Sequence, residues 1–186
     1  MRQAKIVTEA ELKRVMAYLS TRRHALRDQT IFAVSFNAGL RAMEIAALKI
    51  EDVYTAEGSV REIIQLHTTK GAQPRRVFVN KRLSAALRRY YPAVSVKKPC
   101  TALFPSQKGG HFSGNTVAQL FLEVYAACRI DGASSHSGRR TMITRLADQG
   151  ISVHVLAAIA GHRNIATTQR YLTVNDALIA RAVELA

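Results

Sequence analysis

The sequence predicts one mainly α-helical domain that carries a small β-hairpin or three-stranded sheet, an α+β fold. Helical patterns with capping residues recur along most of the chain, and only the stretch from 61 to 80 changes to residues that favour strands. The length of 186 residues suits one sizeable core and is too short for two comfortable ones. We therefore expect residues 1–186 to form a single domain.

Capping residues define the first two helices. Thr8 and Glu11 form a capping box, in which each side chain bonds a free backbone N–H at a helix start, so a helix is expected from about 9 to 19. A second helix should run from about 24 to 37, and Gly39 can then take the left-handed conformation that ends it.

The next helix should open at Leu40 and Arg41, where neighbours of a tight turn can hold a long cationic side chain in place. Further on, strand-forming residues at 61–68 and 76–80 flank a turn-like segment, which predicts a hairpin with Lys70 at its tip. A lysine at such a tip is either simply solvated or delivered into a neighbouring cleft, and the sequence leaves both open.

Helices return in the second half of the chain. A helix over 81–91 should stop at Pro92, a loop should follow over 93–114, and another helix should span 115–128.

The last third combines short helices with residues that carry chemistry. Ser135 is expected to cap the first helix, which Gly150 closes, and Gly161 should break the second. His136 and Arg139, three residues apart, share a face in the first turn. The expected helices span about 136–149 and 152–160, a third begins at 164 and contains Tyr171, and a last one spans about 175–186.

Composition indicates a polyanionic partner. Lys and Arg number 27 against 13 acidic residues, a net charge of +14, and nucleic acid is the leading candidate. A cationic surface without a dedicated ligand is the alternative at this point. Cys100 and Cys128 have no metal-site spacing and suggest a reducing cytoplasm, and we expect neither a signal peptide nor a membrane-spanning segment. No cofactor or metal is expected, because neither a metal-ligand set nor a P-loop occurs.

The charged residues suit chemistry on a phosphodiester. Negative charge on the nonbridging oxygens grows in the pentavalent transition state, and guanidinium groups bind such oxygens in pairs while staying charged. Arg41 and Arg139 are the candidates for this role. His136, His162 and Lys70 can supply proton transfers.

Tyr171 is the candidate nucleophile. Its phenol is unreactive at a pKa of about 10, but surrounding cations stabilise the phenolate. A covalent phosphotyrosine would conserve the energy of the broken bond for rejoining.

These residues resemble a known set in their order and spacing. Asn37–Ile45 (NAGLRAMEI), Lys70, the run His136-Ser137-Gly138-Arg139, the pair Gly161-His162 and Tyr171 resemble the catalytic domain of the tyrosine recombinase (phage integrase) family over nearly the whole chain. In that family two arginines clamp the scissile phosphate, a lysine protonates the leaving 5′ oxygen, histidines position and shuttle protons, and a tyrosine forms a 3′-phosphotyrosyl link. By similarity these catalytic roles fall on Arg41, Lys70, His136, Arg139, His162 and Tyr171, with Glu44 in support.

The chain departs from the family pattern in three places. Gly138 and Ala160 stand where the family usually has leucine, and Gly138 is expected to weaken the turn that holds Arg139. We also expect the family's N-terminal core-binding domain to be absent, which should weaken DNA binding. An excised catalytic fragment and a minimal single-domain recombinase are both compatible with this.

The sequence thus predicts a site-specific DNA recombinase or integrase that acts on double-stranded DNA through a covalent 3′-phosphotyrosyl intermediate. The alternatives are a non-catalytic DNA-binding regulator with the same fold and a DNA-relaxing enzyme that resembles type IB topoisomerases. The helix over 175–186 has an apolar face with little chain left to cover it. Since such segments dock on neighbouring protomers in the family, self-association on DNA as a synaptic tetramer is expected, and no membrane contact.

Overall fold

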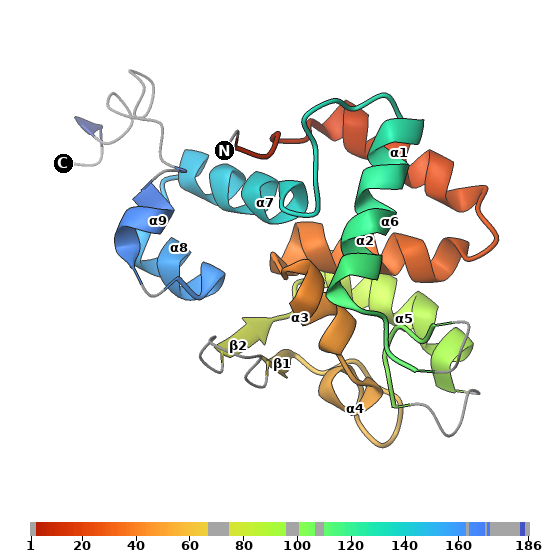
Figure 1. Ribbon diagram of the computed structural model, residues 1–186. Coiled ribbons are helices and arrows are strands. Elements are labelled where there is room, and N and C mark those ends of the chain that lie inside the picture. Colours follow the sequence, from red (N-terminus) through yellow and green to blue (C-terminus); the bar gives the residue numbers. More distant parts are fainter. Residues whose placement is uncertain are drawn as a thin grey trace.

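The computed structural model of the protein describes residues 3–66, 75–95, 101–106, 110–162, 164–169, 171 and 183–184. Within these ranges the chain is mainly helical, and two short strands pair antiparallel, as expected (Figure 1). The helices are α1 (Glu9–Ser20), α2 (Ala25–Ala38), α3 (Ala42–Ala47), α4 (Ile50–Val53), α5 (Lys81–Ser95), α6 (Gly114–Ala127), α7 (Ser137–Asp148), α8 (Val153–Ala160) and α9 (Ile165–Gln169), and the strands are β1 (Ile63–Leu66) and β2 (Arg75–Phe78).

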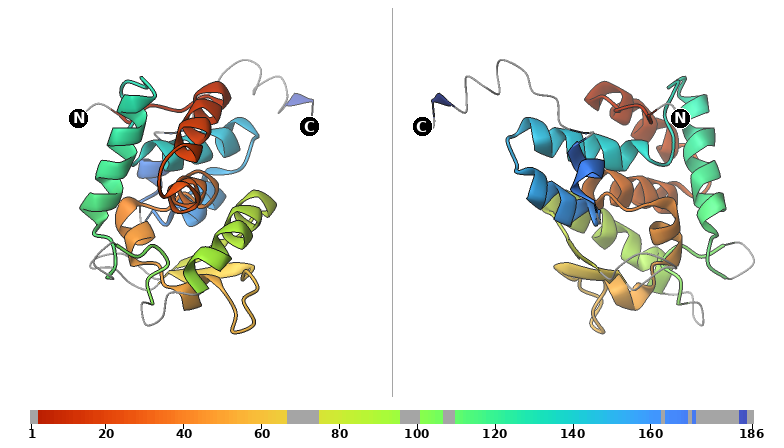
Figure 2. Two further views of the ribbon diagram at one scale, coloured as in Figure 1. Left: turned by 90° about the vertical axis from the view of Figure 1, so that its right-hand side faces the viewer. Right: turned by 60° about the vertical axis from the view of Figure 1, so that its left-hand side comes forward.

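Helix α2 lies at the centre of the fold, where it packs against α1, α3, α5 and α7 (Figure 2). Its side chains Ile31, Phe32 and Val34 are completely buried. The ring centroid of Phe32 lies 4.4 Å from that of Phe121 on α6, so these aromatic groups join α6 to the same core. At the other end of the chain, α8 packs against α7 and α9, to one side of the central helices in Figure 1.

The expected capping is confirmed at three helix ends. At α1, the Thr8 hydroxyl accepts a hydrogen bond from the Glu11 N–H at 3.2 Å, and the Glu11 carboxylate accepts one from the Thr8 N–H at 2.9 Å. Gly39 ends α2 with φ 61°, and Gly161 ends α8 with φ 62°. Both glycines adopt the left-handed conformation that residues with a Cβ atom disfavour.

The two strands form the expected hairpin with a shifted boundary. Leu66 of β1 pairs with Arg75 of β2, one residue before the predicted strand start. Val77 is buried and the intervening Arg76 is exposed, so Arg75 shares the inward face of β2 with Val77. The predicted tip residue Lys70 lies outside the described residues.

The prediction that Pro92 stops α5 is wrong, because the helix continues to Ser95. Tyr90 and Val94 are buried on either side of Pro92, while Pro92 itself is exposed. Burial of these apolar groups thus holds the last turn in place despite the backbone hydrogen bond that proline cannot donate.

The prediction that Ser135 caps α7 is also wrong. His136 occupies the N-cap position, without a side-chain cap, and Ser135 is buried in the preceding turn. That turn is closed locally instead, because the Ser134 N–H donates to the Ser137 hydroxyl at 3.0 Å and the His136 N–H donates to the Ser134 hydroxyl at 3.3 Å.

In the part of the chain that the structure describes, no helix is long and apolar enough to cross a membrane. The predicted last helix, over 175–186, falls outside the described residues except for 183 and 184.

Candidate active site

One cavity of about 280 Å³ brings together five of the six sequence-predicted site residues. These are Arg41, His136, Arg139, His162 and Tyr171. Four further residues line the same cavity: Gln3, Ala4, Arg140 and Thr167. The Arg140 Nη1–H group donates to the Ala4 carbonyl at 2.7 Å, so the segment before α1 forms part of the wall. The sixth predicted residue, Lys70, is outside the described residues.

Arg41 lies at the start of α3, in extended conformation just beyond the left-handed turn at Gly39. Its backbone N–H donates to the Glu44 carboxylate at 2.7 Å, and its Nη1–H donates to the same carboxylate at 3.3 Å. The Arg41 side chain lines the cavity and is 38% exposed, so guanidinium N–H groups that do not bind Glu44 are open to a ligand there. Glu44 therefore fixes Arg41 at both its backbone and its side chain.

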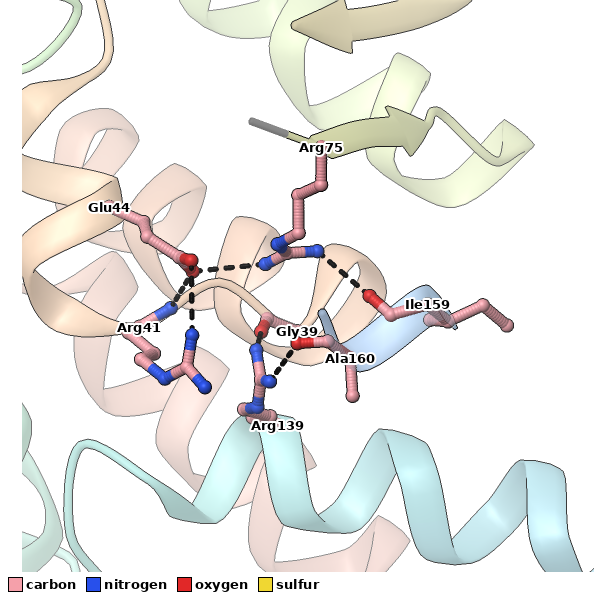
Figure 3. Close-up of polar contacts among 7 residues, drawn as sticks. All are labelled: Gly39, Arg41, Glu44, Arg75, Arg139, Ile159 and Ala160. Carbon is pink, nitrogen blue, oxygen red and sulfur yellow. Dashed lines mark hydrogen bonds and ion pairs between the residues drawn. The ribbon is translucent and has the colours of Figure 1, made fainter. Parts of the chain in front are cut away.

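Arg139 is held in place by backbone carbonyls. It is only 4% exposed, and its Nη1–H donates to the Gly39 carbonyl at 2.7 Å while its Nη2–H donates to the Ala160 carbonyl (Figure 3). Burial, followed by the charges of Arg41 and Arg75, lowers the Arg139 pKa to about 10. Arg139 thus stays cationic at neutral pH, and three of the five guanidinium N–H groups remain for a ligand.

Gly138 has a packing role that its sequence context does not reveal. A Cβ atom at this position would collide with the Ser35 hydroxyl and lie 3.0 Å from Cδ2 of Phe36. Glycine therefore lets the first turn of α7 lie directly against α2. Arg139 follows Gly138 in that turn, where the sequence predicts a weakened helix. Its hydrogen bonds to the Gly39 and Ala160 carbonyls hold its side chain in place there.

His162 follows the left-handed turn at Gly161 and sits between Thr168 and Tyr171. Its Nδ1 lies 2.8 Å from the Thr168 hydroxyl, and its ring stacks on that of Tyr171 with centroids 6.0 Å apart. Burial, followed by the charges of Arg139, Arg41 and Arg75, lowers the His162 pKa to about 4. The ring is therefore neutral at pH 7, which suits it to hydrogen bonding rather than to donation as an imidazolium.

The other two predicted residues are less enclosed. His136 is exposed at the start of α7. Tyr171 is half-buried and lies beyond the end of α9, where its backbone N–H donates to the Thr168 carbonyl at 2.9 Å. The expectation that Tyr171 belongs to this helix is therefore wrong. Its N–H bonds the carbonyl three residues earlier, as in a turn, and not the carbonyl four residues earlier, as in an α-helix.

Sequence reasoning missed Arg75, which completes the charged network behind the cavity. Its guanidinium donates to the Glu44 carboxylate at 3.0 Å and to the Ile159 carbonyl at 2.8 Å (Figure 3). The signal that indicates it is the alternation in β2, which puts Arg75 on the same inward face as Val77. An arginine on the buried face of a strand needs partners for its charge.

Comparisons with known proteins show the family and the fold of this chain. The model of the phage integrase family matches residues 5–177. A tyrosine recombinase XerD of Neisseria meningitidis is 29% identical over 174 residues, covering 91% of this chain and 58% of its own length. A XerA of Pyrococcus horikoshii is 26% identical over 185 residues, covering 98% and 61%.

Solved structures are similar over the whole chain. The crystal structure of XerA recombinase has a TM-score of 0.80 and 26% identity, covering 100% of this chain and 66% of that one. A Tn1549 transposon integrase structure has a TM-score of 0.81 at 18% identity, which shows a shared fold. The chain spans about half to three fifths of the length of the curated relatives it matches.

Proposed function

The chain belongs to the phage integrase family of tyrosine recombinases, and we propose that it cuts and rejoins DNA strands through a covalent 3′-phosphotyrosyl intermediate on Tyr171. The observation that carries this proposal is the convergence of Arg41, Arg139, His162 and Tyr171 on one cavity from segments far apart in the sequence. A tyrosine in one cavity with two arginines and a neutral histidine suits nucleophilic attack on a phosphodiester, because the arginines can stabilise the negative charge that develops on the phosphate.

In the proposed reaction the two arginines bind the scissile phosphate. The open guanidinium donors of Arg41 and the three free N–H groups of Arg139 converge on the nonbridging oxygens. Because Arg139 is buried, its interaction with the developing negative charge is weakly screened. His162, neutral at pH 7, donates a further hydrogen bond to the phosphate or accepts one from Tyr171.

Two proton transfers are proposed for the remaining groups, His136 and Lys70. The Tyr171 oxygen attacks phosphorus while its proton passes to a base, for which the exposed His136 at the cavity rim is our candidate. The bond to the 5′ oxygen breaks, and Lys70 is proposed to protonate that oxygen. In the reverse step a 5′-hydroxyl of a partner strand attacks the phosphotyrosine, and the phenol regains its proton.

Double-stranded DNA is the proposed partner, with assembly of several copies on it. Solved structures with this fold include a Tn1549 integrase in complex with circular intermediate DNA, a XerH recombinase bound to a difH substrate and a lambda integrase dimer bound to a core site. The chain's net charge of +14 fits a polyanionic ligand. We propose that copies of this chain likewise bind DNA together and that four of them form a synaptic tetramer.

Nicked suicide duplexes tiled across the DNA that flanks the gene test the proposal. Loss of the short strand beside the nick prevents rejoining, so a denaturant-resistant protein–DNA adduct should accumulate with the wild-type chain and disappear in Tyr171→Phe. DNA binding without any adduct would favour the non-catalytic regulator. Relaxation of supercoiled DNA by single copies, independent of sequence, would favour the topoisomerase-like enzyme.

A further inference from the structure

Arg75 lies behind the proposed cleavage site and has no established role in it. Its side chain is only 10% exposed, although it belongs to a hairpin strand at the edge of the fold. The described residues that line the cavity include Arg41 and His162 but not Arg75. Arg75 can therefore act on the reaction through the groups that it touches and through its charge, which contributes to the lowered pKa values of Arg139 and His162.

The first of these groups is Glu44. Its carboxylate is 9% exposed and accepts from the Arg41 N–H, the Arg41 guanidinium and the Arg75 guanidinium. Burial raises the Glu44 pKa, but the charge of Arg75 and hydrogen bonds from Arg41 and Arg75 outweigh it, so the Glu44 pKa lies below its usual value. Of the two arginines that pair with Glu44, Arg75 has the less exposed side chain, at 10% against 38% for Arg41. Arg75 thus keeps Glu44 ionised, and Glu44 in turn orients Arg41.

The second group is the C-terminal end of α8. The last carbonyls of a helix have no intrahelical partner and form its negative pole. Here Arg75 binds the Ile159 carbonyl and Arg139 binds the Ala160 carbonyl, so two arginines from different elements hold successive residues (Figure 3). The turn that follows lies on the Arg75 side chain, since a Cβ atom at Gly161 would be 2.5 Å from its Cδ. His162 comes directly after this turn.

We propose that Arg75 is a positioning residue for strand cleavage, which couples Arg41, through Glu44, to the turn that presents His162. This inference rests on the proposed function. Lysine cannot replace arginine in this role, because a single ammonium group does not reproduce the two divergent N–H contacts to Glu44 and Ile159. The coupling also links the hairpin to α8, through two residues, Arg75 and Ile159, that lie 84 positions apart in the sequence.

The test compares Arg75→Lys and Arg75→Met with the wild type on the nicked duplex that gives the Tyr171 adduct. At saturating DNA, the single-turnover rate of adduct formation should fall by about 10- to 100-fold, as for a misplacement of catalytic groups by about 1 Å. DNA affinity, measured in the Tyr171→Phe background, should change by less than about threefold, because Arg75 does not line the cavity. Arg76→Lys, at the adjacent exposed position, is the matched control and should react at the wild-type rate.

A second substrate separates positioning from general damage to the fold. A methylphosphonate at the scissile position removes the nonbridging charge that Arg41 is proposed to neutralise. The penalty for Arg75→Lys should shrink on this duplex, and combining it with Glu44→Gln should cost less than the sum of the two single effects. A wild-type rate for Arg75→Lys, or an equal penalty on both duplexes, would overturn the inference.

A measurement without DNA keeps this inference distinct from the proposed function. Arg75→Lys retains the charge, so a change in the NMR titration of the His162 ring reports movement of the turn. We expect the His162 pKa to rise from about 4 towards 6.5 as the ring becomes more hydrated. An unchanged titration would contradict positioning by Arg75, whereas a wild-type chain that forms no Tyr171 adduct would contradict the proposed function alone.

Discussion

Arg139 exemplifies how single residues of this protein combine structural and chemical duties. Its guanidinium closes the C-terminal ends of two helices, through the carbonyls of Gly39 and Ala160, and still faces the cavity. Such a contact orients the cation before any ligand arrives, so less ordering is needed when a phosphate binds. The position of Arg139 therefore depends on the close approach of α7 to α2, which Gly138 permits.

Gly138→Ala tests this packing at the residue scale. In an unconstrained helix the change stabilises by about 0.5–1 kcal/mol, because glycine loses more backbone freedom on folding. Here the added methyl group meets Ser35 and Phe36, so we expect a loss of about 1–3 kcal/mol in the free energy of unfolding. Urea denaturation measures it, with Gly110→Ala, where a Cβ atom meets nothing within 4 Å, as the control. Equal or greater stability of Gly138→Ala would refute the packing role.

The environment of His162 predicts a dependence of stability on pH. The His162 pKa is about 4 in the folded protein against 6.5 in the unfolded chain, so the unfolded chain takes up the proton first as the pH falls. Its contribution to stability is therefore fully present above pH 6.5 and is lost between pH 6.5 and 4. In His162→Gln, the free energy of unfolding should fall less steeply across this window.

Urea denaturation at several pH values between 7 and 4 measures this slope, and His154→Gln, at an exposed position, controls for the loss of an imidazole. The same slope in His162→Gln as in the wild type would show that the histidine is not held neutral by its surroundings.

At the scale of elements, the helix ends that depend on neighbouring residues could be predicted from the sequence. The capping box at Thr8 and the left-handed glycines at 39 and 161 act within a few residues, and their helix ends are confirmed. The boundary at Pro92 could not be predicted, because it depends on burial of Val94 by distant elements. Arg75 was missed because the predicted strand begins at residue 76, and the alternation with Val77 includes Arg75 only when the strand extends to the residue that pairs with Leu66.

Pro92→Ala tests whether packing overrides proline in α5. Alanine restores the backbone N–H and removes the steric conflict of the ring with the preceding turn, at an exposed position where no core contact is lost. We expect the variant to be more stable by roughly 1–3 kcal/mol, with some of the gain offset by the greater freedom of the unfolded chain. Thermal unfolding followed by circular dichroism measures it, and a less stable variant would show that Pro92 is favourable where it lies.

At the scale of the whole molecule, the fold brings the α2–α3 turn, the start of α7 and the α8–α9 segment to one cavity. The order and spacing of Arg41, His136, Arg139, His162 and Tyr171 sufficed to predict that they meet, and the predicted family and fold are confirmed. Their catalytic roles stay predictions, as do the single-domain organisation, the role of Lys70 and assembly through the last helix. The electrostatic network of Glu44, Arg75 and the α8 carbonyls required the three-dimensional structure.

The most direct test of the central claim is to identify the residue that carries DNA after cleavage. The adduct trapped on a nicked duplex is digested with nuclease and trypsin, and the modified peptide is sequenced by mass spectrometry. The account predicts a 3′-linked nucleotide phosphate on Tyr171, within the tryptic peptide 171–181, and no modified peptide from Tyr171→Phe. A nucleotide on any other residue, or an adduct of equal abundance in Tyr171→Phe, would contradict it.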